Sequence, residues 1–290
     1  MVEKVVVAVN GGPGSRAALE WVIARSHEVP MSLEITTVVE TGPWTSSFTE
    51  EREIPAYERM LATAAALVSE NSPGTKVQTT LRRGSTRHQL ILASAGVDLF
   101  VIGTRESTGY FSGTLRQQVA VGAHCPVIVI PADWTPSGGH VVVGVDDDDT
   151  SDVALEFAAA EAERLGRTLH AVHAWHIPPL VAAEFAGTGT DVITGFEAAE
   201  SEVIDRAVAK ITEHRPNVEV SAVTREGPAA AVLTDAARGA DLLVVGTHRR
   251  GMLPGLILGS VGHDLLISLP CPVAIVSHPD DVALDASAES

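Results

Sequence analysis

Short runs of Val, Ile and Leu alternate with amphipathic stretches along the whole chain. In the first half, strands are expected at 4–10, 32–40, 76–82, 97–103 and 125–131, and helices at 15–26, 57–70 and 86–95. The apolar runs are nearly continuous, which is typical of parallel strands that are buried on both faces of a sheet. The pattern therefore predicts an α/β fold built on an open, five-stranded parallel sheet with helices on both faces.

The same order of elements recurs in the second half. Its expected strands are 140–146, 168–175, 218–225, 241–246 and 271–277, and its expected helices are 151–166, 200–215 and 229–239. Matching landmarks pair Asn10 with Asp146, Gly103 with Gly246, and Cys125 with Cys271. The repeat predicts two tandem α/β domains rather than one large sheet.

The boundary between the two domains is expected where Pro and Gly interrupt the pattern, in PADWTPSGG. We assign 1–132 to the first domain, 133–139 to the linker, 140–279 to the second domain and 280–290 to a tail. The long segments 40–56 and 175–197 exceed usual connections between a strand and a helix. Each is either mobile surface or a lid or protein-binding flap.

Open parallel sheets bind ligands beyond the carboxyl ends of their strands, at the switch point in strand order. In the second half this edge carries Asp146, Ala174 and Gly246, and GTHRRGMLPGLILGSV follows the last of these strands. Backbone N–H groups at a helix N-terminus have no intrahelical partner, so they suit phosphate oxygens. The glycine-rich segment is therefore either a phosphate cradle or a surface loop.

Composition narrows the classes of partner. The formal net charge of −17 argues against sequence-independent binding of nucleic acid. No apolar run reaches membrane-spanning length, and the first residues lack the pattern of a secretion signal, so we expect a cytoplasmic protein without a membrane partner. Cys125 and Cys271 stand in matching CPV contexts that favour buried thiols over a disulfide or a metal site.

These features together resemble the universal stress protein family in its tandem two-domain form. The resemblance covers nearly the full chain and rests on VVVGVDDDDTSDVALEFAAAEA, LHAVHAW, REGPAAAVL, the glycine-rich segment and CPVAIVS. It implies sheets of the adenine nucleotide alpha hydrolase type, related by a pseudo-twofold axis, whose final strands pair antiparallel. It also implies ATP binding in stress adaptation, with Mg²⁺ or Mn²⁺ as a possible companion of the nucleotide.

Nucleotide-binding members of that family carry the pattern G-x2-G-x9-G-[ST]. Gly246, Gly259 and Ser260 match it, whereas Arg249 stands at the second glycine, and Gly251 offers a way to re-form the loop. The resemblance places adenosine and phosphates against residues that we predict as a binding site: Gly144, Val145, Asp146, Ala174, Gly246, His248, Arg249, Gly251, Gly259, Ser260 and Val261.

The acidic run DDDD at 146–149 has two interpretations. Asp149 or Thr150 would cap the next helix, because helix N-termini favour Asp and Thr. Alternatively, Asp147 or Asp148 would help to bind a divalent cation with the triphosphate. We favour capping, and we assign no metal ligands.

The first half departs from the family pattern. Glu106 stands at the second glycine, Arg116 and Gln117 stand at the Gly-Ser pair, and Asn10 replaces the aspartate. We therefore expect at most one functional pocket per chain, in the second half, with the first half as a packing partner. A different anion or partner could still use arginines of this half, namely Arg82, Arg83, Arg105 and Arg116.

The remaining candidates for chemistry are weak. His170 and His173 lie on one strand but point to opposite faces, so with His176 they do not make a convincing metal site. No Ser, Cys or carboxylate pair has a nucleophile and base context, so we predict no catalytic residues and at most slow ATP hydrolysis.

The sequence therefore predicts a stress-response regulator that binds ATP in its second domain. Its partners would be an adenine nucleotide, the other domain of the same chain, and possibly a second copy in a homodimer. Two alternatives stay open: a scaffold or partner-binding module without nucleotide, and an enzyme of adenylate chemistry.

Overall fold

The computed structural model describes residues 2–41, 47–104, 114–176, 190–247 and 258–277. In the first half these form β1 Glu3–Ala8, α1 Pro13–Ser26, β2 Met31–Glu40, α2 Ser47–Asn71, β3 Lys76–Gly84, α3 Thr86–Ala93, β4 Leu99–Gly103, α4 Thr114–Gly122 and β5 Val127–Ile130. The second half has β6 Val141–Val145, α5 Asp149–Leu165, β7 Leu169–Trp175, α7 Thr190–His214, β8 Val220–Glu226, α8 Ala229–Ala236, β9 Leu242–Gly246, α9 Ser260–Ser268 and β10 Val273–Val276. The expected alternation of strands and helices is confirmed.

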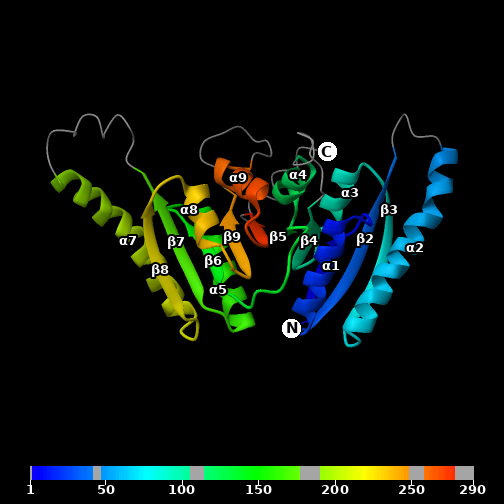
Figure 1. The fold of residues 1–290 in the computed structure, drawn as a ribbon, viewed down its shortest axis with the longest axis horizontal. Coiled ribbons are helices and arrows are strands. Elements are labelled where there is room, and N and C mark those ends of the chain that lie inside the picture. The colour runs from blue at the N-terminus through cyan, green and yellow to red at the C-terminus, as the bar shows by residue number, and fades with distance from the viewer. Residues whose placement is uncertain (1, 42–46, 105–113, 177–189, 248–257, 278–290) are drawn as a thin grey trace.

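The five-stranded sheets of the two halves join at their edges, so the strands form one continuous sheet in the order β3-β2-β1-β4-β5-β10-β9-β6-β7-β8. The repeat is present as expected, but the expectation of two sheets rather than one large sheet is wrong in this respect. All pairs within each half are parallel, and β5 and β10 pair antiparallel at the centre, with Ala274 opposite Ile128. Figure 1 shows the resulting symmetry, with α2 and α7 at the two outer ends. The open parallel sheets and the antiparallel contact of the final strands are therefore confirmed.

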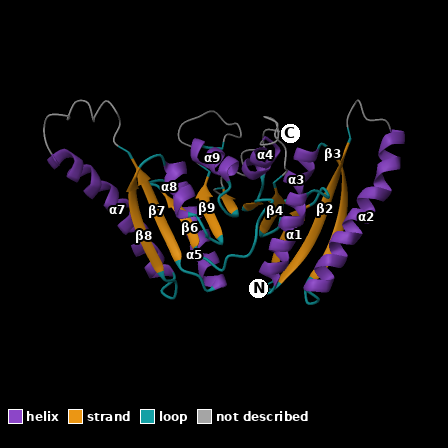
Figure 2. Ribbon diagram, in the orientation of Figure 1, coloured by secondary structure: helices purple, strands orange, loops and turns teal. Residues whose placement is uncertain are grey.

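Helices cover both faces of the sheet (Figure 2). One core lies under α1, α2, α5 and α7, and it includes Val22, Leu61, Leu155 and Ile211. The other lies under α3, α4, α8 and α9, and it includes Leu90, Val119, Leu233 and Leu265. Burial on both faces explains why the inner strands read as nearly unbroken apolar runs, whereas the edge strands β3 and β8 are partly exposed and more polar.

The second helix of each half begins earlier than the apolar periodicity predicts. We expected helices from 57 and from 200, but α2 begins at Ser47 and α7 at Thr190. Much of the expected connections 40–56 and 175–197 is therefore helical. The rest of both connections falls largely on 42–46 and 177–189, which lie outside the described residues. The early turns were missed because their sequences, with Pro55 inside α2, lack a clear apolar stripe.

A buried cluster of charges ties α1 of one half to α5 of the other. Arg25 donates to Glu161 over 2.6 and 2.9 Å and to Glu3 over 2.9 Å. Arg164 pairs with both carboxylates from the rim. Burial alone would raise the pKa of Glu3, but the hydrogen bonds and charges of Arg25 and Arg164 outweigh it and lower that pKa.

The two cysteines are free thiols, and burial raises the pKa of each to about 12. A thiol with so high a pKa is unreactive at neutral pH, which fits a packing role. None of the described helices is long and apolar enough to cross a membrane. Residues 131–140, which include the expected linker, contain neither helix nor strand.

Candidate functional site

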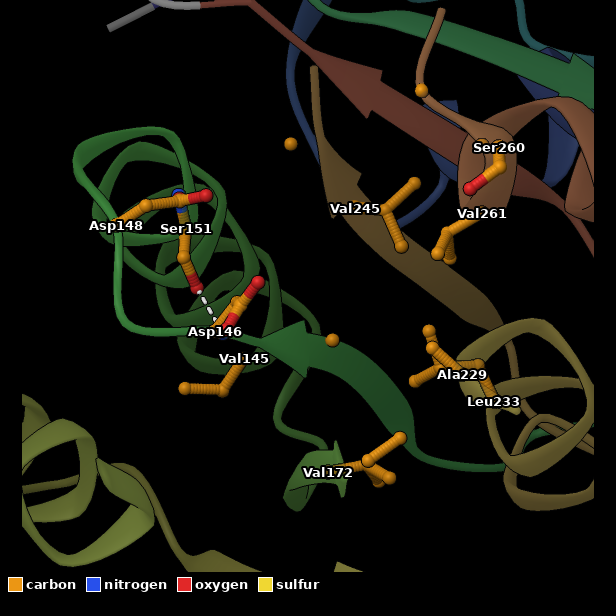
Figure 3. Close-up of a pocket in the computed structure, with 15 residues that line it drawn as sticks. Val145, Asp146, Asp148, Ser151, Val172, Ala229, Leu233, Val245, Ser260 and Val261 are labelled. Atoms are coloured by element: carbon orange, nitrogen blue, oxygen red, sulfur yellow. Dashed lines mark hydrogen bonds between the residues drawn. The ribbon is translucent and has the colours of Figure 1, made fainter. Parts of the chain in front are cut away.

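A cavity of about 260 Å³ opens at the carboxyl edge of the second half, between β6, β7 and β9 and the first turns of α5 and α9 (Figure 3). Eight of the predicted site residues line it: Gly144, Val145, Asp146, Ala174, Gly246, Gly259, Ser260 and Val261. The other three, His248, Arg249 and Gly251, lie outside the described residues. The eight come from four elements and their flanking turns, and the fold brings them to one place.

One wall of this cavity is apolar. Val172, Val245, Val261 and Leu233 line it, from four different elements. Gly144 forms part of the floor, and a Cβ atom there would lie 3.0 Å from Leu233 Cδ1. A larger residue at this position would push Leu233 into the cavity, so the glycine preserves a narrow apolar slot. Such a slot suits a flat, weakly polar ring.

The N-terminus of α9 faces the cavity without a capping side chain. Gly259 is its N-cap and makes no side-chain hydrogen bond, and Ser260, Val261 and Gly262 form the first turn. The N–H groups of a first helical turn have no intrahelical acceptor and carry the positive end of the helix dipole. This end of the cavity therefore offers hydrogen-bond donors to an anion.

The opposite end of the cavity is acidic. Asp148 caps α5, with its Oδ1 accepting from Ser151 N over 2.8 Å, and Ser151 Oγ accepts from Asp146 N over 2.8 Å (Figure 3). The sequence-based choice of Asp149 or Thr150 as cap is wrong, because both residues already belong to the helix. The pattern could not resolve this, since three consecutive acidic residues can each serve as a cap.

The Asp146 carboxylate is held at the mouth of the cavity. Its Oδ1 accepts from Asp147 N over 2.9 Å, which orients the group, and within the described part of the chain Oδ2 makes no hydrogen bond. An ionised carboxylate is purely an acceptor, so it suits hydroxyl donors or a hard cation. Among the described residues no group of three or more His, Cys, Asp or Glu side chains has the geometry of a metal site.

Sequence reasoning missed part of the wall. The missed residues are Ser151, Val172, Ala229, Leu233, Val245 and Gly262, whereas Asp148 was considered only as a possible cation ligand. Two of the missed residues could have been found: Ser151 lies in the first turn of the helix that follows Asp146, and Gly262 follows Ser260 in the first turn of α9. The contribution of Leu233 depends on how α8 packs over β6, which no local pattern encodes.

The histidines of β7 separate as predicted. His173 is buried, donates from Nδ1 to Val145 O and lies 2.8 Å from Glu200 Oε2 through Nε2. His170 instead stacks on His140, with ring centroids 3.9 Å apart. His173 thus fixes the end of β6 against α7, next to the cavity.

The first half has its own cavity at the equivalent edge, of about 850 Å³, lined by residues that include Asn10, Ser15 and Gly103. We expected Arg116 and Gln117 to replace the Gly-Ser pair, and this alignment is wrong. Helix α4 begins at Thr114, as α9 begins at Ser260, so Thr114 is the equivalent of Ser260. Arg116 is therefore the equivalent of Gly262. The loop before this helix is shorter in the first half, so counting residues along the family motif assigned the Gly-Ser pair to positions too far along the chain. Glu106 lies outside the described residues.

Comparisons with known proteins agree with this architecture. The model of the universal stress protein family matches residues 1–131 and again 139–277. A universal stress protein of Mycobacterium tuberculosis is 30% identical over 311 residues, covering 97% of each chain. One from Mycolicibacterium smegmatis is 30% identical over 297 residues, covering 94% of this chain and 96% of the relative.

Solved structures give the same result at the level of fold. The crystal structure of a universal stress protein from Archaeoglobus fulgidus superposes with a TM-score of 0.72 at 18% identity, covering 94% of this chain and 98% of that one. A putative universal stress protein from Pseudomonas aeruginosa superposes with a TM-score of 0.65 at 17% identity, covering 100% of this chain and 98% of that one. Two matched segments, relatives of the same length and the shared fold lead to one conclusion: the chain belongs to the universal stress protein family.

Proposed function

We propose that the second half binds ATP in the cavity between β6, β9 and α9, and that the protein acts in the stress response through this nucleotide-bound state. The observation that carries the proposal is that one cavity combines an apolar slot, an oriented carboxylate and an uncapped helix N-terminus. These three features match the three parts of a nucleotide, namely base, ribose and phosphates.

The base would occupy the slot between Val172, Leu233 and Val261, where apolar side chains remove a flat ring from water. The Asp146 carboxylate would accept hydrogen bonds from the ribose hydroxyls. Because α5 already has the Asp148 cap and α9 has none, the phosphates belong at α9. The cavity thus gives the nucleotide a single orientation.

A divalent cation fits this arrangement as a companion of the phosphates. Asp146 and Asp148 place two carboxylates on the wall, and carboxylates close to a triphosphate repel it unless a cation intervenes. Mg²⁺ or Mn²⁺ would supply that positive charge while keeping most of its ligands from phosphate and water. ATP affinity should therefore depend strongly on the metal.

The stress-response role follows from the family to which the chain belongs. In this role the nucleotide acts as a ligand that stabilises one state of the protein, in the cytoplasm. None of the described cavity residues pairs a nucleophile with a base, so the proposal needs no catalysis. A second copy of the chain is a further proposed partner. The molecular mass of the protein in solution tests whether it forms this homodimer.

The test is a thermal-shift titration with ATP and Mg²⁺ or Mn²⁺ on the wild type and on Gly259→Asp. At about 100 times its dissociation constant, a ligand stabilises the native state by roughly 2.7 kcal/mol, which gives a visible shift. Gly259→Asp puts a negative charge at the N-cap of α9 and should abolish the shift.

Ile267→Asp is the matched control, because it adds the same charge to an exposed position of the same helix. Its shift with ATP should equal that of the wild type. If ATP raises the melting temperature with neither Mg²⁺ nor Mn²⁺, and if no nucleotide is extracted from the purified protein, the proposal is overturned in favour of a nucleotide-free scaffold.

A further inference from the structure

The cavity of the first half has a different chemistry from its counterpart. It lies at the carboxyl ends of β1, β2 and β4 and is closed by α2, α3 and α4. Asn10, Ser15, Thr37, Tyr57 and Ser85 place amide and hydroxyl groups on its wall. A ligand here would need to be polar.

Two arginines line this cavity, and the described part of the chain offers them no matching acceptor. The Nε atoms of Arg87 and Arg116 are buried, and neither has a hydrogen-bond partner among the described residues. Neither guanidinium pairs with a carboxylate in the described part of the chain. Burial lowers the pKa of Arg116, as expected for a cation that lacks an anionic neighbour. Both side chains are half-buried, and a buried N–H donor such as their Nε is costly to leave without an acceptor.

Glu40, the one carboxylate among the described residues of this wall, is already engaged. It accepts hydrogen bonds from the backbone N–H and the hydroxyl of Thr86, at the start of α3. It therefore acts as a cap for α3 and forms no ion pair with either arginine. The described residues therefore give this wall a net positive charge, in a protein whose formal net charge is −17.

The second half has uncharged residues at the positions that are equivalent to Arg87 and Arg116. Arg87 is the second residue of α3, and Ala230 is the second residue of α8. Arg116 is the third residue of α4, where α9 has Gly262. The first half thus adds two long cations where the second half has no charged side chain.

The apolar slot is also changed. Thr36 pairs with Ala8 across β1 and β2 as Val172 pairs with Gly144 across β6 and β7. Thr36 hydrogen-bonds Thr80 O and accepts from Arg82, so a polar network replaces the surface on which a base would pack. Asn10, in place of Asp146, binds the N–H of Gly12 with its Oδ1. The wall does not favour adenosine.

We propose that the first half binds a small polar metabolite through an oxyanion group, phosphate or carboxylate, held by Arg87 and Arg116. Guanidinium groups bind both kinds of oxyanion through charge-assisted, often paired hydrogen bonds. The site is separate from the nucleotide cavity of the second half, so it does not depend on ATP binding there. The chain would then carry two ligand sites of different selectivity, one for a nucleotide and one for a small oxyanion.

The experiment is isothermal titration calorimetry with three probes: inorganic phosphate, glycerol 3-phosphate and succinate. The variants are Arg87→Gln and Arg116→Gln, each of which removes a charge and keeps most of the side chain. Arg83→Gln is the matched control, because Arg83 is exposed and does not line the cavity. Circular dichroism and the melting temperature establish that each variant is folded.

We expect at least one probe to bind once per chain, with affinity reduced at least tenfold in each cavity variant and unchanged in Arg83→Gln. Tighter binding of glycerol 3-phosphate than of succinate identifies a phosphorylated ligand, and the reverse order identifies a carboxylate. Either order supports the site.

Three results would overturn the proposal. One is that none of the three probes binds, and another is that binding is equal in the wild type and in folded Arg116→Gln. The third is a second molecule of ATP per chain that is lost in Arg116→Gln, because the cavity would then be a nucleotide site. Gly259→Asp should leave phosphate binding intact, so a failure of the nucleotide proposal is distinguishable from a failure of this one.

Discussion

The cavities of the two halves lie at the same edge of equivalent sheets, yet the charged groups that the described residues place on their walls differ in sign. Asp146 and Asp148 line the second, whereas Arg87 and Arg116 outweigh Glu40 in the first. The backbone elements around them are equivalent, so the difference comes from a few side chains. A duplicated fold can therefore keep its cavity and change the ligand that the cavity selects.

The contact between the halves shows the same divergence. Arg25, near the end of α1, and Glu161, near the end of α5, occupy equivalent positions and pair with each other over 2.6 Å. Two identical halves would bring like charges together at this place. Opposite charges at equivalent positions thus favour pairing of the two different halves over pairing of two copies of either one.

The largest expected effect concerns this contact. Arg25→Met removes the cation and leaves Glu3 and Glu161 buried beside each other, with only Arg164 at the rim. Breaking one partner of a buried ion pair costs about 3–5 kcal/mol. Urea unfolding at pH 7 should show a loss of that size. Arg16→Met, in an exposed pair on the same helix, should change the stability by less than about 1 kcal/mol.

The same variant should have a characteristic dependence on pH. The pKa of Glu3 is lowered in the folded state. Its pairing therefore stabilises the protein at pH values above 4.5, the ordinary pKa of a Glu carboxyl, and this stabilisation is lost as the pH falls through the folded pKa. In Arg25→Met, acid neutralises a carboxylate that is already poorly paired. The stability difference between wild type and variant should therefore shrink as the pH falls from 7 to 4. A constant difference across this range would contradict the assigned role of Glu3.

The next variant tests whether the volume of a side chain at the position of Gly262, without its charge, is enough to exclude ATP from the cavity of the second half. Gly262→Gln gives the second half an uncharged polar side chain at the position equivalent to Arg116, although it is shorter than an arginine. A Cβ atom at Gly262 already comes within 2.9 Å of Leu258 Cδ1, so the added atoms must enter the cavity or displace Leu258. ATP affinity should fall roughly 100-fold, about 2.7 kcal/mol. Gly262→Ala, the smaller step, should stay within about tenfold of the wild type by calorimetry.

A smaller effect is expected at the first turn of α5. Asp148→Ala removes the side chain that accepts from Ser151 N, and loss of an N-cap typically costs about 1 kcal/mol. The equivalent helix α1 has Gly12 as its N-cap without a side-chain bond, so it already lacks this contribution. Asp152→Ala, which breaks only a half-exposed pair with Lys210, should cost less in the same unfolding experiment.

The smallest effect sharpens the difference between the two slots. Val172→Thr installs in the second half the residue type that the first half has at Thr36. Without the partners that Thr36 has, the new hydroxyl is poorly hydrogen-bonded against a base, which costs roughly 0.7 kcal/mol. ATP affinity should fall about threefold relative to the wild type, and the melting temperature without ligand should fall slightly, because Val172 is buried in the core. An unchanged affinity would show that the base does not pack on Val172.

Local patterns in the sequence were sufficient for the strands and for much of the second cavity. Apolar runs located the inner strands because both of their faces are buried, and the glycine motif located Gly246, Gly259 and Ser260. The edge strands β3 and β8 are partly exposed and were located from their place in the repeat. Motif counting failed in the first half, where a shorter loop moved Arg116 out of its assumed register. The Arg25 cluster could not be predicted, because its partners are distant in sequence and meet only when β5 and β10 pair.

The central claim is that one cavity per chain takes ATP and the other does not. Calorimetric titration of the wild type and folded Arg116→Gln with ATP and Mg²⁺ tests it most directly. We expect one ATP per chain in both proteins, and loss of that single site in Gly259→Asp. Two ATP molecules per wild-type chain, or one that is lost in Arg116→Gln while Gly259→Asp still binds, would contradict it.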